Sequence, residues 1–345
     1  MEGKCNLAIT KQKYGTLPDG RDVHMYTVDN GEGLKAEFLD FGCVITRLVV
    51  TDENSIATDV VLGQSGLDTY IDNFGNLGIT VGRFANRMRN SMFEINGEKF
   101  YQQPNEGKNI CHSSISNFGK MLWQASYDDA SSEISFELLS PDGENGYPGD
   151  LNTVVTFTLE GKKLIIHYEA VSSKDTPVNL TNHSYFNLNG HLSGCVCHHT
   201  LKLYADYYTP TDSENIPTGE ILTVKGTPYD FTEGKEVGAD MDKAGLYDLN
   251  YVLTGTGLRK VAELWGDKTG IKMTTYTDKP GLQLYVRDDY GDLVYKDGAK
   301  YDPYQSICLE TQLFPNCMEY SHFPSAVVKC GEKYDYTTIY EFEHE

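Results

Sequence analysis

The sequence predicts an all-β protein built as a large antiparallel β-sandwich, and three observations support this. Short segments with apolar residues at every second position recur almost from end to end. Turn-forming Gly, Pro, Asn and Asp separate these segments. Long amphipathic helices do not alternate with them, which argues against a parallel α/β sheet. No repeat of fixed period is visible either, so a propeller or a solenoid is disfavoured.

The individual elements follow from local patterns. A short helix is expected at residues 65–73, and Asn96-Gly97 predicts a hairpin over residues 93–101 because this dipeptide favours a type I′ turn. The Pro- and Gly-rich run at residues 141–149 resembles a linker, but strand-like runs flank it closely, so we interpret it as a loop. The clearest strand candidates are residues 135–139, 153–159, 164–171, 202–204, 271–277 and 336–342.

Length, composition and charge limit the possible functions. A β-sandwich can exceed about 200 residues as one unit, so we expect a single domain over residues 1–345. With 39% hydrophobic and 12% aromatic residues, the chain can bury a sizeable core. A net charge of -21 disfavours nucleic acid and anionic membranes, which are bound by clustered Lys and Arg. The oligomeric state stays open.

The expected compartment is the cytoplasm. The first 15 residues lack the apolar core of a secretory signal, and no later stretch has the length of a membrane span. Two glycosylation sequons begin at Asn179 and Asn182, where a glycan would block the site proposed below. Most of the eight cysteines are expected to be reduced, because they are too scattered for a disulfide framework: Cys5, Cys43, Cys111, Cys308, Cys317 and Cys330.

Polar residues capable of chemistry are concentrated in a few segments: residues 83–89, 109–114 and 179–189, together with Asp248 and Glu310. His183 lies in a run of Asn, Thr, Ser and Tyr side chains, a composition that suits a sugar ligand. Glu310 is predicted at the end of an apolar strand, where burial would raise its pKa. A lone His or Glu is more often structural, so these residues need their context.

The sequence around these residues resembles the aldose 1-epimerase, or galactose mutarotase, family, and the resemblance extends along nearly the whole chain. Seven ordered segments carry the resemblance: GRFANRM at 82–88, NEGKNICH at 105–112, SPDGENGYPGDL at 140–151, TPVNLTNHSYFNLNG at 176–190, IPTGEI at 216–221, PGLQLYV at 280–286 and CLETQLFP at 308–315. The resemblance implies a large β-sandwich that interconverts the α and β anomers of free hexoses.

The resemblance also implies a role for each site residue. Glu310 matches the catalytic base, His183 matches the catalytic acid, and His112 matches a second imidazole beside the ring oxygen. The remaining matches are sugar-binding residues: Asn86, Arg87, Asp248 and Gln283.

The proposed chemistry requires two proton-transfer groups. Opening a pyranose ring removes a proton from the C1 hydroxyl and delivers one to the ring oxygen. With reference pKa values of about 4.3 and 6.5, Glu and His can serve as base and acid at neutral pH. We therefore expect no metal and no cofactor, and we find no glycine-rich nucleotide-binding motif.

Three departures from the family pattern concern substrate preference. The segment that is usually Leu-His-Gly-Gly is Cys-His-Ser-Ser here, so Ser113 and Ser114 replace two permissive glycines. Residues 285–289 read YVRDD where a Thr-Gly-Asn-Phe-like sequence is common, which introduces Arg287. Leu249 replaces a frequent histidine.

Four alternatives were weighed against this hypothesis. Cys195, Cys197, His198 and His199 could ligate zinc, but their spacing lacks paired C-x-x-C motifs, so a polar strand edge or turn is favoured. A non-catalytic sugar-binding protein would lose the acid or the base. A hexose-6-phosphate epimerase should show extra cations, of which Arg287 is the one candidate. A glycosidase would need paired carboxylates.

Overall fold

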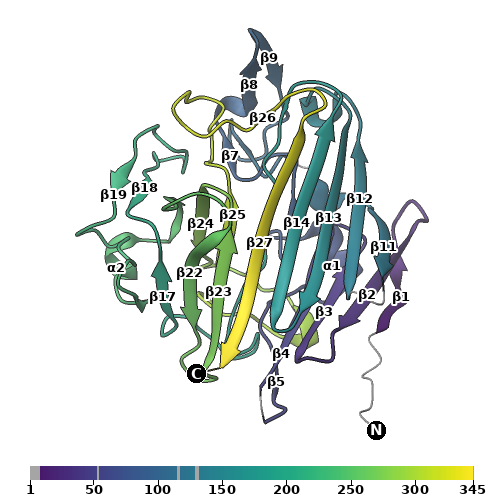
Figure 1. Ribbon diagram of the computed structural model, residues 1–345, viewed down its shortest axis with the longest axis vertical. Coiled ribbons are helices and arrows are strands. Elements are labelled where there is room, and N and C mark those ends of the chain that lie inside the picture. The colour runs from purple at the N-terminus through teal and green to yellow at the C-terminus, as the bar shows by residue number, and fades with distance from the viewer. Residues whose placement is uncertain (1–7, 53, 115–116, 129–131, 345) are drawn as a thin grey trace.

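The computed structural model of the protein describes residues 8–52, 54–114, 117–128 and 132–344. In these residues the chain forms three main sheets and four two-stranded ribbons, with antiparallel strand pairs throughout the sheets (Figure 1). The α-helices are short, namely α1 (Leu67–Asp72) and α2 (Met241–Ala244). The predicted all-β class is therefore confirmed.

The first sheet has five strands in chain order: β1 (Ala8–Thr16), β2 (Asp22–Asp29), β3 (Leu34–Leu39), β4 (Val44–Thr51) and β5 (Ala57–Asp59). The largest sheet has nine, in the order β11 (Gln124–Asp128), β12 (Glu133–Ser140), β13 (Leu151–Glu160), β14 (Lys163–Ser172), β27 (Lys333–His344), β23 (Ile271–Thr277), β22 (Arg259–Trp265), β17 (Thr200–Leu203) and β20 (Lys235–Glu236). The third has five, in the order β19 (Leu222–Thr223), β18 (Tyr207–Thr209), β21 (Asp248–Val252), β24 (Gly281–Val286) and β25 (Ile307–Gln312).

The four ribbons connect loops around the third sheet. They pair β6 (Thr80–Val81) with β16 (Thr181–Asn182), β7 (Arg87–Met88) with β10 (Ile110–Cys111), β8 (Met92–Ile95) with β9 (Glu98–Tyr101), and β15 (Thr176–Pro177) with β26 (Val327–Val328). The β6–β16 ribbon joins a segment of the N-terminal third of the chain to one from its middle, whereas the β7–β10 ribbon joins two segments of the N-terminal third.

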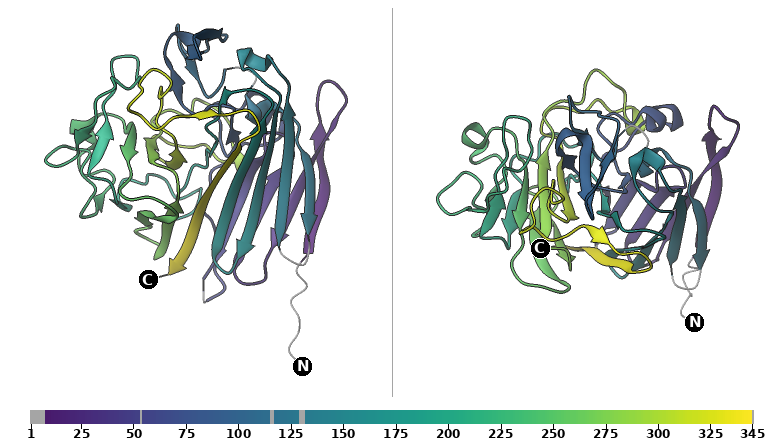
Figure 2. Two further views of the ribbon diagram at one scale, coloured as in Figure 1. Left: turned by 45° about the horizontal axis from the view of Figure 1, so that its top comes forward. Right: turned by 90° about the horizontal axis from the view of Figure 1, so that it is seen from above.

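The sheets face one another as the layers of a sandwich (Figure 2). Phe38 on β3 packs against Phe157 on β13, with ring centroids 4.7 Å apart, which joins the first sheet to the largest one. Tyr340 on β27 donates a hydrogen bond to the Leu309 carbonyl on β25, so the third sheet is joined to the same layer. One hydrophobic core cluster contains residues of all three sheets, from Ile9 to Phe342.

The local sequence patterns located most elements correctly. Strands β8 and β9 form the predicted Asn-Gly hairpin, and α1 lies inside the predicted helical segment. Strands β12, β13, β14, β23 and β27 contain the predicted strands, whereas β17 ends one residue earlier than predicted. Residues 141–149 connect β12 to β13 as a loop.

The cysteines agree with the expectation except at one place. Cys43, Cys111, Cys308, Cys317 and Cys330 are free thiols, and Cys5 lies outside the described residues. Cys195 and Cys197 form a disulfide, so the expectation of reduced thiols is wrong for this pair. Their Cα atoms are 5.4 Å apart across one intervening residue, a separation within the range that a disulfide can bridge.

Candidate active site

A small cavity of about 170 Å³ brings most of the predicted site residues together. It lies at the face of the third sheet, next to the loops that the β6–β16 and β7–β10 ribbons hold. Its lining consists of Gly75, Asn76, Asn86, Arg87, Cys111, His112, His183, Tyr185, Asp248, Tyr285 and Glu310. The volume is below the roughly 300 Å³ at which pockets for drug-sized ligands begin, so it suits one small ring.

A larger cavity of about 510 Å³ lies between the β8–β9 hairpin and the loop of residues 141–149. Of its three acidic residues, Asp142 is exposed and paired with Lys174 at 2.6 Å. Buried titratable groups with strongly shifted pKa values identify a reactive site better than volume does. We therefore assign the chemistry to the smaller cavity.

Glu310 occupies the interior of β25 rather than its end, which corrects the sequence-based prediction. It is the fourth of six residues, all buried, and its side chain is only 2% exposed. Its Oε1 lies 3.6 Å from Nε2 of His183, whereas Oε2 has no hydrogen-bond partner among the described residues. Burial, followed by the negative charge of Asp248, raises the pKa of Glu310 well above its ordinary value.

His183 follows strand β16 and is held by its backbone and by its neighbours. Its amide donates to the Ile79 carbonyl, and its ring stacks on Tyr185 with centroids 5.0 Å apart. The His112 ring meets it edge-on at 5.2 Å. Nδ1 of His183 lies 3.7 Å from Sγ of Cys308, so Nε2 is the nitrogen that faces Glu310.

Relative to the reference values used for the prediction, the pKa of Glu310 is raised and the pKa values of the two histidines are lowered. Burial, followed by the neighbouring His112, lowers the pKa of His183 well below its ordinary value. Burial and then the charge of Arg87 lower the pKa of His112 to about 4. Both imidazoles are therefore neutral at pH 7, and a proton shared by Glu310 and His183 prefers the carboxyl group when the cavity is empty.

The loop that carries His112 keeps a glycine-like path despite its two serines. His112, Ser113 and Ser114 have φ values of 51°, 61° and 74°, in the left-handed region that favours glycine. The Ser113 hydroxyl accepts from the Phe84 amide and donates to the Phe84 carbonyl, and Ser114 donates to the Gln103 carbonyl. These bonds offset the strain of the backbone.

His112 is joined to the neighbouring strand by backbone contacts. Its Nδ1 accepts a hydrogen bond from the Asn86 amide at 3.1 Å, and its own amide donates to the Asn86 carbonyl. The free Nε2 is therefore the nitrogen that is available to a ligand. The side chain of Asn86 lines the cavity, and its Oδ1 accepts from the Arg87 amide.

Arg87 connects two carboxylates at the mouth of the cavity. Its Nε and Nη2 donate to both oxygens of Glu106, at 2.7 and 3.0 Å, and Nη1 donates to Asp248 at 3.0 Å. Nη1 and Nη2 each retain one further N–H. Gln283 donates to Asp248 at 2.6 Å and is not part of the lining, so it holds Asp248 instead of facing the cavity.

Several lining residues had not been singled out from the sequence. Tyr185 stood inside the polar run that was recognised, but no role was given to it. Gly75 and Asn76 belong to a turn with two left-handed residues, for which an N-x-G-N pattern was the available signal. Tyr285 lies on β24 opposite Cys308 of β25, a pairing that only the strand register reveals.

The polar run around His183 is mainly scaffold, not lining. Asn179 bonds the Leu313 backbone on both its oxygen and its nitrogen, and Asn187 donates to the carbonyls of Gly194 and Gln305. The side chain of Asn182 donates to the Gly78 carbonyl. Both sequon asparagines are buried, so neither could carry a glycan in the folded protein.

Two arginines of the segment 83–89 also lie away from the cavity. Arg83 is buried and donates to the Ser140, Pro141 and Pro148 carbonyls, which fixes the loop of residues 141–149. Arg89 forms ion pairs with Asp212 and Glu319. Both arginines are therefore structural.

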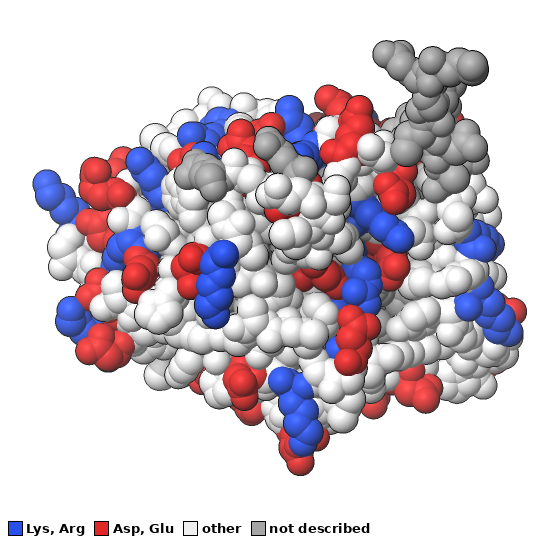
Figure 3. Space-filling model, turned by 90° about the horizontal axis from the view of Figure 1, so that it is seen from below, with Lys and Arg blue, Asp and Glu red and all other residues white. Residues whose placement is uncertain are grey.

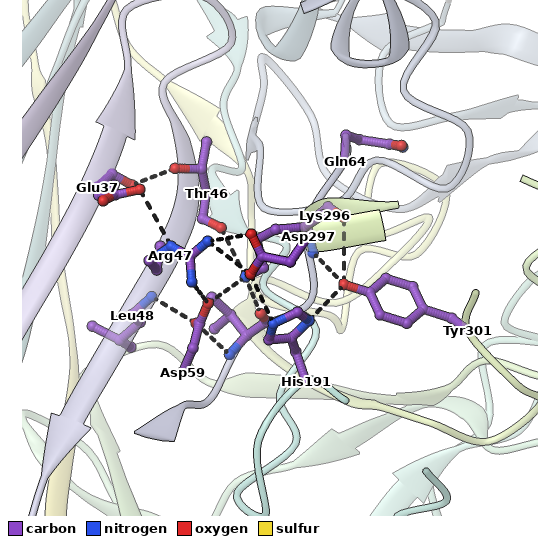
Figure 4. A network of polar contacts seen from close by, with 12 residues as sticks. Glu37, Thr46, Arg47, Leu48, Asp59, Gln64, His191, Lys296, Asp297 and Tyr301 are labelled. Atoms are coloured by element: carbon purple, nitrogen blue, oxygen red, sulfur yellow. Dashed lines mark hydrogen bonds and ion pairs between the residues drawn. The ribbon is translucent and has the colours of Figure 1, made fainter. Parts of the chain in front are cut away.

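A buried group of side chains and a partly exposed one have the composition of metal ligands. Ligand atoms of His112, His183 and Glu310 lie within 4.8 Å of one another, and the same is true of Asp59, His191 and Asp297. In the second group the carboxylates are already paired with cations: Lys296 lies 2.7 Å from Asp59, and Arg47 bonds both Asp59 and Asp297 (Figure 4). That group is an ion-pair network of the scaffold.

The segment from Cys195 to His199 is not arranged as the zinc site that was weighed as an alternative. The two thiols are consumed by the disulfide, and His198 is exposed beside Glu236. His199 is buried, its Nε2 accepts from the Leu188 amide, and its Nδ1 lies 3.1 Å from Asp267. These residues form a tightly bonded turn.

The sandwich has a small cavity that holds a buried carboxyl group beside two imidazoles, an arrangement typical of enzymes that transfer protons. A family model described as aldose 1-epimerase matches residues 24–341. The chain belongs to the aldose 1-epimerase family and is an isomerase.

Relatives of known sequence and structure agree with this assignment. The chain is 37% identical to the galactose mutarotase of Bos taurus, over 97% of this chain and 99% of that protein. It is 30% identical to the aldose 1-epimerase of Escherichia coli, over 94% of this chain and 96% of that protein. An aldose epimerase homologue from C. elegans superposes with a TM-score of 0.86 at 30% identity, and the match covers 92% of this chain and 98% of that chain. A galactose 1-epimerase from Lactobacillus acidophilus superposes with a TM-score of 0.84 at 26% identity, and the match covers 98% of this chain and 99% of that chain.

Among the described residues, no helix combines the length and the apolar character that crossing a bilayer requires.

Proposed function

We propose that this protein interconverts the α and β anomers of free hexoses such as galactose and glucose by acid/base opening and closure of the ring. The observation that carries the proposal is the approach of Glu310 and His183 to 3.6 Å inside a cavity sized for one ring. The bovine relative is a galactose mutarotase, which supports a hexose substrate.

In the proposed reaction the ionised Glu310 removes the proton from the C1 hydroxyl of the cyclic sugar. The C1–O5 bond breaks, and protonated His183 delivers its proton to the ring oxygen. The products are an open-chain aldehyde, a neutral Glu310 and a neutral His183. Rotation about the C1–C2 bond presents the other face of the aldehyde, and the reverse transfers close the ring as the other anomer.

The pair carries one proton throughout this cycle, and burial decides where it prefers to be. Ring opening transfers that proton, in effect, from His183 to Glu310. Because burial raises the pKa of Glu310 and lowers that of His183, this is the direction that the protein environment favours. Sugar hydroxyls that donate to Glu310 would stabilise its ionised form before the reaction, and His112 would support the ring oxygen from its Nε2.

The remaining side chains of the cavity are proposed to orient the sugar. Asp248 can accept hydrogen bonds from sugar hydroxyls, since each of its carboxylate oxygens has a spare lone pair. Arg87 and Asn86 can donate hydrogen bonds to hydroxyl oxygens. Gln283 would act through Asp248. Holding the ring still relative to Glu310 and His183 is itself a large part of catalysis.

A hexose 6-phosphate is a poor candidate substrate. Arg87 is the cation in the described lining, and two carboxylates already neutralise it. Arg287, the unexpected cation of the sequence, does not line the cavity. The protein also carries a net charge of -21, which repels anions.

We further propose a cytoplasmic protein in which residues 1–345 act as one unit, without nucleic-acid or membrane partners. Free thiols and buried sequon asparagines support this compartment. On the face seen from below, basic and acidic side chains are interspersed, so that face offers no surface of one sign to a phosphate backbone (Figure 3). No metal or nucleotide is proposed to be required, because two proton-transfer groups suffice for the reaction.

Polarimetry tests the proposal directly. Freshly dissolved α-galactose, α-glucose, xylose and arabinose should reach anomeric equilibrium faster with enzyme, and the 6-phosphates of glucose and galactose should respond poorly. A 6-phosphate with the highest kcat/KM would overturn the assigned substrate class. Activity that exhaustive chelation removes and zinc restores would overturn the metal-free route and assign zinc to His112, His183 and Glu310.

A further inference from the structure

Arg287 is a buried cation without a carboxylate partner. It directly follows β24, only 4% of its surface is exposed, and no carboxylate of the described residues forms an ion pair with it. Its guanidinium lies 4.6 Å from the ring centroid of Phe74, 4.7 Å from Tyr290 and 5.8 Å from Tyr185. The negative faces of these rings attract the guanidinium in place of a carboxylate.

The guanidinium also bonds two backbone carbonyls. Nε donates to the Asp289 carbonyl at 2.5 Å, and Nη1 donates to the Phe74 carbonyl at 3.3 Å. The fork of Arg287 therefore connects its own loop to the turn that contains residues 74–76, which are more than 200 positions away in the sequence.

That turn forms one wall of the cavity through Gly75 and Asn76. Gly75 has a φ of +87°, and a Cβ built on it would lie 1.6 Å from Nη1 of Arg287. The backbone of the wall therefore rests directly on the guanidinium. The Tyr185 hydroxyl donates to the Gly75 carbonyl from another side of the turn.

A second path leads from Arg287 to the proposed catalytic acid. Tyr185 lies under the guanidinium and stacks on His183 with an interplanar angle of 15°. The stack limits rotation of the imidazole, which must keep Nε2 aimed at Glu310. One buried side chain thus supports both a wall of the cavity and the ring of His183.

We propose that Arg287 is a positioning residue of the mutarotase reaction, which holds the Gly75–Asn76 wall and the Tyr185–His183 stack in one arrangement. This inference rests on the proposed function. Displacement of a reacting group by about 1 Å can cost on the order of 100-fold in rate. Lysine cannot replace the planar fork, which bonds two carbonyls and packs against three rings at once.

The first test compares Arg287→Lys and Arg287→Met with Arg259→Lys. Arg259 is a matched control because it also bonds backbone carbonyls, those of Thr254, Gly257, Thr277 and Lys279, outside the cavity. In protein that stays folded at the assay temperature, both Arg287 variants should lose about tenfold in kcat/KM for galactose, with kcat reduced and KM raised. Arg259→Lys should stay within twofold.

The second test is a double-mutant cycle with Gly75→Ala. The added methyl group would point at Arg287 and not into the cavity, so it displaces the wall only while the guanidinium is present. The backbone strain of an alanine in the left-handed conformation is the same with and without Arg287, so it cancels in the comparison. Gly75→Ala should therefore reduce kcat/KM about tenfold in the parent protein and less than threefold in Arg287→Ala.

The outcomes separate this inference from the proposed function. A parent protein that does not accelerate mutarotation refutes the function. An active parent whose Arg287→Lys variant keeps kcat and KM within threefold refutes the positioning role. Equal losses from Gly75→Ala in both backgrounds refute the contact. If Arg287→Met or Arg287→Ala fails to fold, the comparison of Arg287→Lys with Arg259→Lys still tests the positioning role.

Discussion

Two clusters of charged side chains in this molecule, one partly exposed around Asp59 and one buried around Glu310, handle charge in opposite ways. In the network around Asp59, two cations bond three carboxylates, and the buried Lys296 also donates to two carbonyls. In the cavity, Glu310 forms no ion pair with Lys or Arg among the described residues, and one of its oxygens has no hydrogen-bond partner there. A satisfied network stabilises the scaffold, whereas an unsatisfied carboxyl is free to exchange a proton.

The largest expected effect comes from removing the exchangeable proton itself. Glu310→Gln should fold and bind sugar but lower kcat at least about 100-fold, because one positioned proton-transfer group contributes about 10²–10⁴. His183→Asn should behave in the same way. Polarimetry or a coupled anomer-specific oxidase measures both, and near-normal kcat in folded Glu310→Gln would show that the base is misassigned.

The same kind of change in the scaffold network should affect stability and not rate. Asp59→Asn leaves Lys296 buried without its carboxylate, which should lower the free energy of unfolding by about 3 kcal/mol. Chemical denaturation measures this, and kcat of the folded variant should stay within twofold. Asp292→Asn is the control, since its ion pair with Lys300 is exposed and its loss should leave the free energy of unfolding almost unchanged. Equal losses in the two variants would refute the contrast.

The pH dependence of stability distinguishes the two clusters further. The pKa of Glu310 is higher in the folded than in the unfolded chain, so its stabilising contribution is complete below the unfolded value and is lost as the pH rises through the folded pKa. Gln imitates the protonated form. Glu310→Gln should therefore be increasingly more stable than the parent as the pH rises from about 5 to 8, measured by denaturant titration. A constant difference would contradict the raised pKa.

The smallest expected effects concern the groups that orient the sugar. Asp248→Asn should raise KM about tenfold, because hydrogen bonds to a charged group contribute about 1.5–3 kcal/mol, and kcat should fall less. Gln283→Leu, which removes the bonds of Gln283 to Asp248 and Gln312 but no group of the cavity lining, should raise KM about threefold. Steady-state kinetics with galactose would contradict this order if Gln283→Leu had the larger effect.

The sequence predicted what depends on local pattern or on ordered motifs. Alternation located the long strands because their inner residues face one continuous core, and the family-like motifs identified Glu310, His183 and His112 as neighbours. The place of Glu310 within its strand was missed because β25 is buried on both faces. Such a strand shows no alternation, so Thr311 and Gln312 resemble the start of a loop.

The electrostatics of the site could not be predicted from residue types. Reference pKa values place the proton on histidine, whereas burial of both groups in one small cavity favours the carboxyl. The wall formed by Gly75 and Asn76, and its contact with Arg287, depend on packing between segments that no local pattern connects. The left-handed conformation of Ser113 and Ser114 is likewise held by hydroxyl bonds to distant backbone groups.

The position of Glu310 inside a doubly buried strand also constrains how the protein can change. Residues of a strand alternate between faces, so inserting or deleting one residue before Glu310 in β25 would turn the carboxyl into the apolar core and bring Leu309 or Thr311 into the cavity. The wall and the His112 loop are turns, which tolerate length changes far better. Variation in substrate range is therefore expected to accumulate in the turns, while β25 evolves by substitution alone.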